Sequence, residues 1–274
     1  MSGSPRQRRP SRTGFTLVEL IIATALGALL LLTIYQVVLV GQRTFSRQAA
    51  RLSVQQTARA ATDVLTALLR ETSAQAGDFL GMGPDSLRLR RPITFAVACD
   101  VSAAPSVVFE PYARWVAQGD SVMVWAENDP ANPADDVWLI GVAGPVDTTA
   151  GCPSGGAGER VELNGLVPPL GANVLSVGAP VRAFQVESYG LRPALGAHYL
   201  ARWVGLAEPV PLVGPLGPPG QGLQLTFLDR LGNVVANPAS VAQIELLVRT
   251  FSPVLDSDGA PIADSLSTRV SLRN

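Results

Sequence analysis

A carboxylate interrupts the most apolar part of the sequence. Between Phe15 and Val40, Glu19 is the single charged residue in a run of 26. Placing a carboxylate inside a membrane helix costs roughly 2.5–3.5 kcal/mol on insertion scales, so such residues usually have a function. Two interpretations of Glu19 stay open on this basis: it belongs to a functional site, or it lies near the membrane interface and stays hydrated.

The two cysteines, Cys99 and Cys152, offer a second kind of chemistry. Both follow the apolar run, so export of this part of the chain would bring them into an oxidising compartment. A disulfide between them would close a loop of about 50 residues, which stabilises a fold by about 4 kcal/mol on chain-entropy grounds. The alternative is a pair of free buried thiols, because the sequence does not determine the distance between them.

The sequence contains no recognisable catalytic or metal-binding motif. The single histidine, His198, and two cysteines are too few for a typical zinc site. A Walker-type phosphate loop requires a lysine, and all 21 basic residues are arginines. The acidic segments 129–136 and 256–259 lack the spacing of a calcium loop, so we expect their aspartates to cap turns. We therefore predict no catalytic residue, no metal, no cofactor and a protein that is not an enzyme.

The apolar run 15–40 is the element that positions Glu19. A helix needs about 20 apolar residues to cross a bilayer, and this run is longer. Arginines precede it at positions 6, 8, 9 and 12, which predicts an N-terminus in the cytoplasm and a long C-terminal part outside it. An ordinary secretory signal is the competing interpretation, but its apolar core would span only about 7–15 residues. We therefore predict a single-pass membrane protein.

Residues 14–20, Gly-Phe-Thr-Leu-Val-Glu-Leu, follow the arginine-rich leader and closely resemble the type IV prepilin signature. The resemblance implies that a prepilin peptidase cuts after Gly14 and then methylates the new amino terminus of Phe15. It also implies a precursor anchored in the lipid of the bacterial inner membrane, whose helix later packs against those of other pilin subunits. Glu19 would then pair with the amino terminus of a neighbouring subunit, and Thr16 would add a hydrogen bond. Such pairing makes a charge tolerable in an apolar bundle.

Two further features resemble the minor members of this family. The 14-residue leader is long, which suits minor pilins. The segments 56–65 and 69–71 resemble the end of the helix in PilW-type minor pilins. The implied function is that of a structural subunit acting in the assembly or priming of a type IV pilus or related filament, first in the inner membrane and then in the periplasm or at the cell surface.

Three alternative functions remain open. A minor pseudopilin of a type II secretion system has a similar start, and a DNA-uptake pilin would need a basic patch on its head. A single-pass, membrane-anchored periplasmic binding module or enzyme would show no cleavage at Gly14 and would tolerate substitution of Glu19. Removal of the leader leaves 17 arginines against 22 acidic residues, so we predict no nucleic-acid partner from bulk charge.

The predicted architecture is α+β and pilin-like, with a long helix followed by a β-rich head. We expect a leader over residues 1–14, a helix over 15–76 with its membrane span at 15–40, and a periplasmic or extracellular head over 77–274. The helix has no proline from Thr16 to Ala76, and the Gly-Asp pair that follows is a typical stop.

Beyond the membrane span, the predicted helix has two apolar stripes. Phe45, Ala49 and Leu52 form the first, which we expect to face other helices of a filament. The second is expected to anchor the sheet of the head and contains Ala61, Leu65 and Leu68, with Val64 beside them. The arginines of this region are expected on the solvated side or at the lipid headgroups, at positions 43, 47, 51 and 59.

Short apolar or alternating segments separated by turn residues predict a mostly antiparallel sheet in the head. The expected strands are 87–91, 94–98, 106–109, 121–126, 136–142, 160–163, 181–189, 198–204, 223–229, 233–235, 241–251 and 267–273. A hairpin-like turn is expected at 230–232. The proline- and glycine-rich segment 209–222 predicts a surface loop, with polyproline-II character and a partner surface as the alternative.

Overall fold

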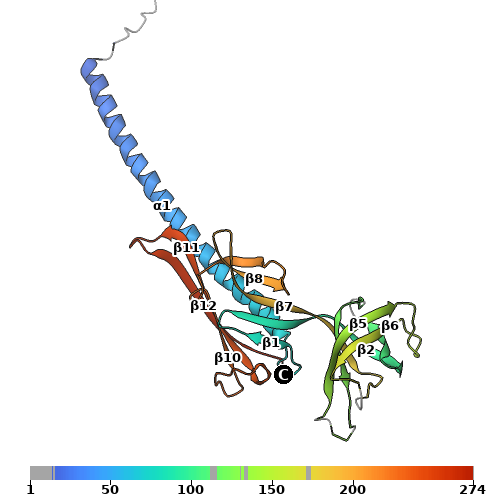
Figure 1. The fold of residues 1–274 in the computed structure, drawn as a ribbon. Helices are drawn as coiled ribbons and strands as arrows, with labels where there is room; N and C mark the ends of the chain where they lie inside the picture. Colours follow the sequence, from blue (N-terminus) through green and yellow to red (C-terminus); the bar gives the residue numbers. More distant parts are fainter. Residues whose placement is uncertain are drawn as a thin grey trace, which may run out of the picture.

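The computed structural model describes residue 14 and residues 16–111, 116–129, 131–132, 135–170 and 174–273. A long helix, α1 (Leu17–Arg70), leads into a β-rich, mostly antiparallel head (Figure 1). This confirms the predicted fold class. Residues 1–13 of the expected leader, together with Phe15, lie outside the described residues.

Helix α1 begins at a capping box and ends earlier than predicted. Thr16 is its N-cap and Arg70 its last residue, where the sequence had suggested Ala76. The chain leaves the helix because the next residues fold back around a buried aspartate. Ser73 N–H donates to a carboxylate oxygen of Asp78 at 2.9 Å, and Gly77 supplies the positive φ of 73° that this turn requires.

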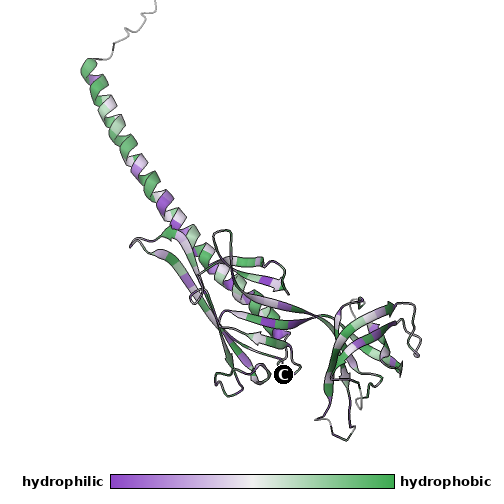
Figure 2. Cartoon of the chain, viewed as in Figure 1, coloured by the Kyte–Doolittle hydropathy of each residue, from purple (hydrophilic) through white to green (hydrophobic). Residues whose placement is uncertain are grey.

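The two halves of α1 differ in their surroundings. Figure 2 shows the N-terminal half as an apolar rod that projects away from the head. The first buried residue along the helix is Ala50, and from there one face packs against the head. The buried residues of α1 are Ala50, Val54, Ala58, Ala61, Thr62, Leu65 and Leu69.

Twelve strands are assigned within the described residues of the head. They are β1 (Phe79–Met82), β2 (Ser86–Ala103), β3 (Ser106–Pro111), β4 (Ser121–Ala126), β5 (Val137–Asp147), β6 (Glu159–Val167), β7 (Pro180–Ala194), β8 (Ala197–Val204), β9 (Val210–Leu216), β10 (Leu223–Leu228), β11 (Gln243–Leu255) and β12 (Pro261–Ser271). A short 3₁₀ helix, Pro238–Ser240, precedes β11. Every described pairing between these strands is antiparallel, as the alternating sequence pattern suggested.

The distal part of the head is a closed barrel. Strand pairing runs from β2 to β3, β6, β5, β4 and β7, and β7 pairs back with β2, so the six strands of the described chain form a ring. Apolar side chains fill it, including Val107, Phe109, Val124 and Leu139. Closure leaves no free sheet edge among these six strands, which removes a common site of unwanted strand pairing.

The proximal part of the head packs on the helix. The N-terminal half of β2 and the C-terminal half of β7 form a sheet with β1, β8 and β9, while β10, β11 and β12 form a second sheet. Both sheets contact α1 through β9, β11 and β12. Their shared core contains Leu65 and Leu69 of the helix with Leu89, Leu200 and Ile244 of the sheets.

Strands β2 and β7 connect the two lobes (Figure 1). They pair from Ser86↔Gly190 to Val97↔Pro180, with a bulge between Pro92 and Thr94. Their outer edges change partner along the way: β2 pairs first with β1 and then with β3, and β7 pairs first with β4 and then with β8. This β2–β7 pair, called the spine below, therefore belongs to both lobes, and its midpoint forms the junction between them.

Three strand predictions differ from the structure. Segments 87–91 and 94–98 form one continuous strand, β2, because the bulge at Pro92 absorbs the break in alternation. Segment 209–222 was predicted as a loop, but β9 lies within it and pairs as an edge strand with β8, where prolines are tolerated. Segment 233–235 forms only an isolated bridge between Leu228 and Val234, although the predicted turn at 230–232 is present.

Candidate assembly site and the junction of the head

The predicted assembly residues Thr16 and Glu19 lie together at the start of α1. Glu19 N–H donates to Thr16 Oγ1 at 3.2 Å, and Thr16 N–H donates to Glu19 Oε2 at 3.4 Å. The Thr16 hydroxyl also lies 3.5 Å from Glu19 Oε2. This reciprocal arrangement is a capping box, which satisfies backbone donors that a helix start leaves unpaired. The expected role of Thr16 was a hydrogen bond in assembly; this local pairing was not expected, although the Thr-x-x-Glu spacing predicts it.

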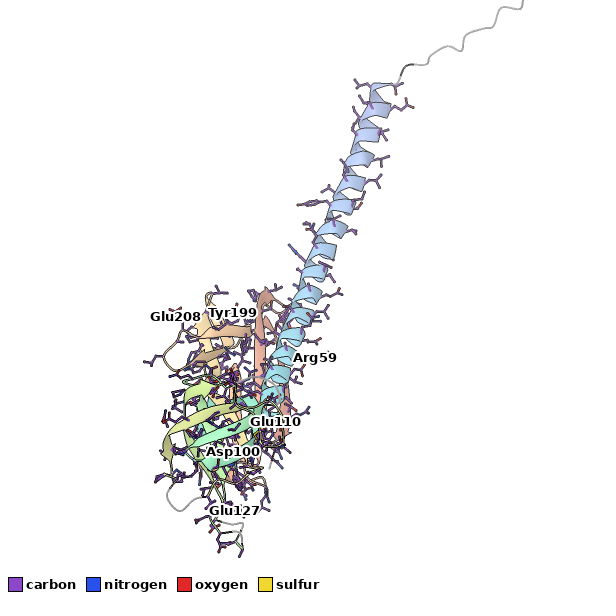
Figure 3. The ribbon with its side chains drawn as sticks, turned by 90° about the vertical axis from the view of Figure 1, so that its right-hand side faces the viewer. Arg59, Asp100, Glu110, Glu127, Tyr199 and Glu208 are labelled. Atoms are coloured by element: carbon purple, nitrogen blue, oxygen red, sulfur yellow. A yellow bond between two sulfur atoms is a disulfide. The ribbon has the colours of Figure 1, made fainter. Side chains whose placement is uncertain are left out.

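The segment that carries Glu19 is fully accessible. Helix α1 is long and apolar enough to cross a membrane, and none of its most apolar window is buried against the head. Figure 3 shows its side chains projecting on all sides well beyond the head. Burial of such a surface requires lipid or other helices, because a rod this apolar is unstable in water. The N-terminal half of α1 is therefore consistent with a membrane anchor.

The two predicted stripes of α1 have different environments. Phe45 is 73% exposed and Leu52 is 58% exposed, whereas Ala61 and Leu65 are buried in the proximal core. Thr250 of β11 is hydrogen-bonded to the buried face of α1, since its hydroxyl donates to the Val54 carbonyl at 2.9 Å. The second stripe therefore anchors the head, as expected, and the first remains available for another surface.

The hairpin between β11 and β12 reaches along α1 toward its apolar N-terminal half (Figure 1). Arg47 Nη2 donates to the carbonyl oxygen of Asp256 in this turn at 3.4 Å. The Asp256 carboxylate accepts from the backbone N–H groups of Ala260 and Asp258, at 3.0 and 2.8 Å. These hydrogen bonds lower the pKa of Asp256, with help from nearby Arg47 and Arg51. Asp256 thus caps a turn, as expected, and no cluster of potential metal ligands occurs in the described part of the chain.

Cys99 and Cys152 form a disulfide, which removes the alternative of two free thiols. Their Cα atoms are 5.5 Å apart, and the bond joins β2 to the connection between β5 and β6. Both cysteines belong to the barrel lobe. The cross-link therefore constrains the barrel rather than the contact between head and helix.

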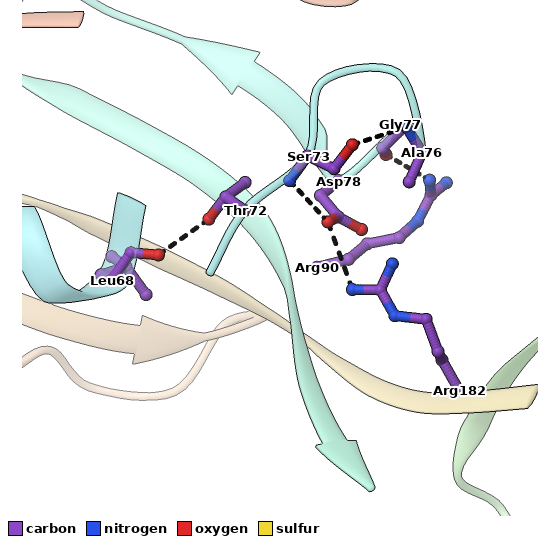
Figure 4. A network of polar contacts seen from close by, with 8 residues as sticks. All are labelled: Leu68, Thr72, Ser73, Ala76, Gly77, Asp78, Arg90 and Arg182. Carbon is purple, nitrogen blue, oxygen red and sulfur yellow. Dashed lines mark hydrogen bonds and ion pairs between the residues drawn. The ribbon is translucent and has the colours of Figure 1, made fainter. Parts of the chain in front are cut away.

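A buried carboxylate, Asp78, organises the junction between the lobes (Figure 4). Its side chain is 0% exposed, and its Oδ2 atom accepts from Ser73 N–H at 2.9 Å and from Arg182 Nη2 at 3.2 Å. Arg90 donates to the Gly77 carbonyl and packs over the Phe184 ring, 5.4 Å from its centroid. The loop after α1 is thereby attached to both spine strands.

A second buried carboxylate, Glu187, lies on β7 in the proximal lobe. It accepts a hydrogen bond from the Tyr189 hydroxyl and lies 3.6 Å from Arg91 and 3.4 Å from Arg202. Burial raises the pKa of Tyr189, and the hydrogen bond to Glu187 adds to this effect. Pairing of this kind is what allows a carboxylate to stay in a core.

The barrel contains a third buried carboxylate, Glu159, whose Oε1 atom accepts from Val116 N–H at 2.8 Å. Burial raises its pKa. None of these three carboxylates could be singled out from the sequence, because strands of this head also carry acidic residues on exposed faces and strand register is not visible along the chain.

The family comparison agrees with this N-terminal geometry. Residues 9–35 match the family model described as the prokaryotic N-terminal methylation motif. The N-terminal segment is therefore similar to that of type IV pilin-like prepilins, and the motif supports a substrate of prepilin peptidase. No curated protein and no solved structure matches the chain.

Proposed function

We propose that this chain is a minor subunit of a type IV pilus or a related filament. Prepilin peptidase cleaves it after Gly14 and methylates Phe15, and the apolar half of α1 holds it in the inner membrane before assembly. In the filament, that half packs against the helices of other subunits, with the head on the outside. The protein contributes subunit contacts rather than catalysis.

One observation carries this proposal: the methylation motif at 9–35 coincides with the start of a helix whose most apolar part is not buried against the described part of the head. A membrane anchor alone explains an apolar helix. It does not explain why the carboxylate of Glu19 lies in the first turn of that helix, five residues after the expected cleavage point at Gly14. A filament subunit uses both features.

Glu19 is the proposed assembly residue, and the capping box suggests how its charge is kept until assembly. In the single chain, the carboxylate accepts two long hydrogen bonds from Thr16, one from the backbone N–H at 3.4 Å and one from the hydroxyl at 3.5 Å. Cleavage creates an ammonium group on the residue before Thr16. A neighbour's ammonium group meeting Glu19 would pair two full charges, which is stronger than long contacts from uncharged donors to the carboxylate. Replacing the contacts to Thr16 by this ion pair favours association of the helices within an apolar bundle.

The first experiment is the mass of the N-terminal peptide from the protein in its native membrane. We expect a peptide that starts at Phe15 and carries one added methyl group. In a Gly14→Val variant, processing should fail because the bulky side chain prevents close approach of the backbone, while Gly14→Ala should be processed. A retained leader in the native protein would instead support the anchored binding module or enzyme.

The choice between a pilus and a type II secretion pseudopilus needs a separate measurement. A photo-reactive amino acid placed at position 52 can cross-link to neighbouring subunits in the native cell. Identification of the attached subunits then distinguishes the two filaments. Pilus subunits are the expected products. Cross-links only to pseudopilins would assign the chain to the secretion system and leave the processing result unchanged.

A further inference from the structure

A cleft of about 550 Å³ lies at the junction between the barrel and the proximal lobe. Its walls come from the end of α1 and the loop after it, from β2, β5 and β7, and from Arg273 near the end of the chain. Clefts between lobes are common positions for ligand sites, and this volume is in the usual range. None of the predicted assembly residues contributes to it.

Arg182 lies in this cleft in a fixed orientation. Its side chain is 15% exposed, because Nη2 contacts Asp78 at 3.2 Å and the guanidinium packs over Trp138, 6.0 Å from the ring centroid. A guanidinium has five N–H donors, so these contacts leave donors for an anion. Since the Arg182 side chain is already ordered, binding of a ligand to it costs less conformational entropy.

The charge of the cleft differs from that of the protein. Arg70 and Arg273 are exposed on its wall, in addition to Arg182, whereas the acidic lining residues are Glu71 and the paired Asp78. The mature chain carries a net negative charge once the four leader arginines are removed. A locally positive cleft on an acidic protein favours one anionic group of a ligand over a long polyanion.

The remaining surface of the cleft is apolar, with one buried acceptor. Phe95, 44% exposed, and the rings of Pro92 and Pro180 form walls that suit a flat side chain. Asp78 also belongs to this lining, and its buried Oδ1 atom has no hydrogen-bond partner among the described residues. A buried acceptor in this state is costly, so a donor from a ligand would stabilise it.

We propose that this cleft binds the C-terminal end of a peptide whose last residue is aromatic. The terminal carboxylate contacts Arg182 and Arg273, the last amide N–H donates to Asp78 Oδ1, and the ring packs against Phe95. An acidic sugar also offers a carboxylate and donors, but it has no flat apolar ring. The apolar walls formed by Phe95 and the two prolines therefore favour the peptide. The proposal is independent of the filament role.

The test is a titration of the mature full-length chain in detergent micelles with N-acetyl-L-phenylalanine. The readout is the NMR shift of the Trp138 indole N–H, assigned with a Trp138→Phe variant. We expect a saturable shift with the acid. N-acetyl-L-phenylalaninamide should bind at least about tenfold more weakly than the acid, since the amide lacks the charge that the arginines contact. No saturable shift, or equal binding of acid and amide, overturns the proposal.

Two variants and a sugar probe sharpen the result. Arg273→Gln removes an exposed cleft cation and should weaken binding of the acid by about tenfold, because one charge-assisted contact is lost. Arg269→Gln removes an exposed arginine in the same C-terminal region but outside the cleft, and should bind like the native chain. Equal loss in both variants, or a saturable shift with D-glucuronate but none with the peptide acid, contradicts the peptide assignment.

Discussion

Glu19 is the residue on which the helix start and the proposed assembly both depend. Its carboxylate caps the helix through Thr16, and the same oxygen atoms would face a neighbour's amino terminus in a filament. The two roles differ in what they require. Capping needs an acceptor, whereas pairing across an apolar interface needs a negative charge.

A Glu19→Gln variant separates these roles, because glutamine keeps the acceptor and loses the charge. We expect normal processing after Gly14 but poor incorporation into filaments. Thr16→Ala is the matched control: it removes the cap at a cost of about 1 kcal/mol and retains the charge, so it should assemble better than Glu19→Gln. Peptide mass spectrometry and immunoblots of sheared filaments give the two readouts. Native-level incorporation of Glu19→Gln would rule out charge pairing.

Asp78 illustrates a second residue-scale point, which is that a buried carboxylate can organise a loop. It connects Ser73 just after the helix to Arg182 on the spine, and the helix ends before the predicted Ala76 because these contacts form instead. Removing one partner of a buried pair leaves an uncompensated charge, whereas the intact pair is tolerated.

At the scale of elements, α1 has two opposite faces. One packs against the head, and the other is available for contacts with other helices. The inner face contributes Leu65 and Leu69 to the proximal core, and the outer face keeps Phe45 and Leu52 exposed. Along most of the helix, nothing in the described head covers the outer face. Separate surfaces allow the head to fold before the helix associates with others.

Alanine substitutions on the two faces should therefore have different effects. Leu65→Ala leaves a cavity in the core and should lower the free energy of unfolding by about 2–5 kcal/mol. Leu52→Ala should change it by less than about 0.5 kcal/mol, as is usual for exposed positions, yet reduce incorporation into filaments. Thermal unfolding in detergent and the filament assay report the two quantities. If Leu52→Ala assembles like the native chain, the outer stripe is not a packing face.

At the scale of the whole molecule, the head consists of two lobes with separate cores joined by β2 and β7 (Figure 1). The proximal lobe is continuous with α1, and the barrel stands apart from the helix. The disulfide lies in the barrel alone. The molecule thus combines a helix-bound platform with a cross-linked distal module, and the proposed ligand cleft lies between them.

Replacing both cysteines by serine should destabilise the barrel selectively. The bond links residues 53 positions apart, and loss of such a loop constraint costs about 4 kcal/mol on chain-entropy grounds. Hydrogen exchange should increase in β3 and β6 and stay nearly constant in β11 and β12. The native chain treated with reductant is the control and should behave in the same way. A uniform increase over both lobes would mean that they unfold as one unit.

The sequence by itself determined the features that depend on neighbouring residues. The apolar run, the Glu19 motif, the two helix stripes and the alternation of many strands are all local patterns, whose period or order is visible along the chain. The fold class followed from them, and so did the family resemblance that the match at 9–35 supports. Turn-capping by Asp256 could also be predicted, because its partners lie within a few residues.

Only the tertiary structure decided the features that depend on distant residues. Pairing of β2 with β7 joins segments about 100 residues apart, and it closes the barrel, divides the head into two lobes and creates the cleft. The cysteine distance, the burial of Asp78 and its contact with Arg182 follow from that pairing. Strand register is set by the sum of many side-chain contacts across the sheet, and no single stretch of sequence contains that information.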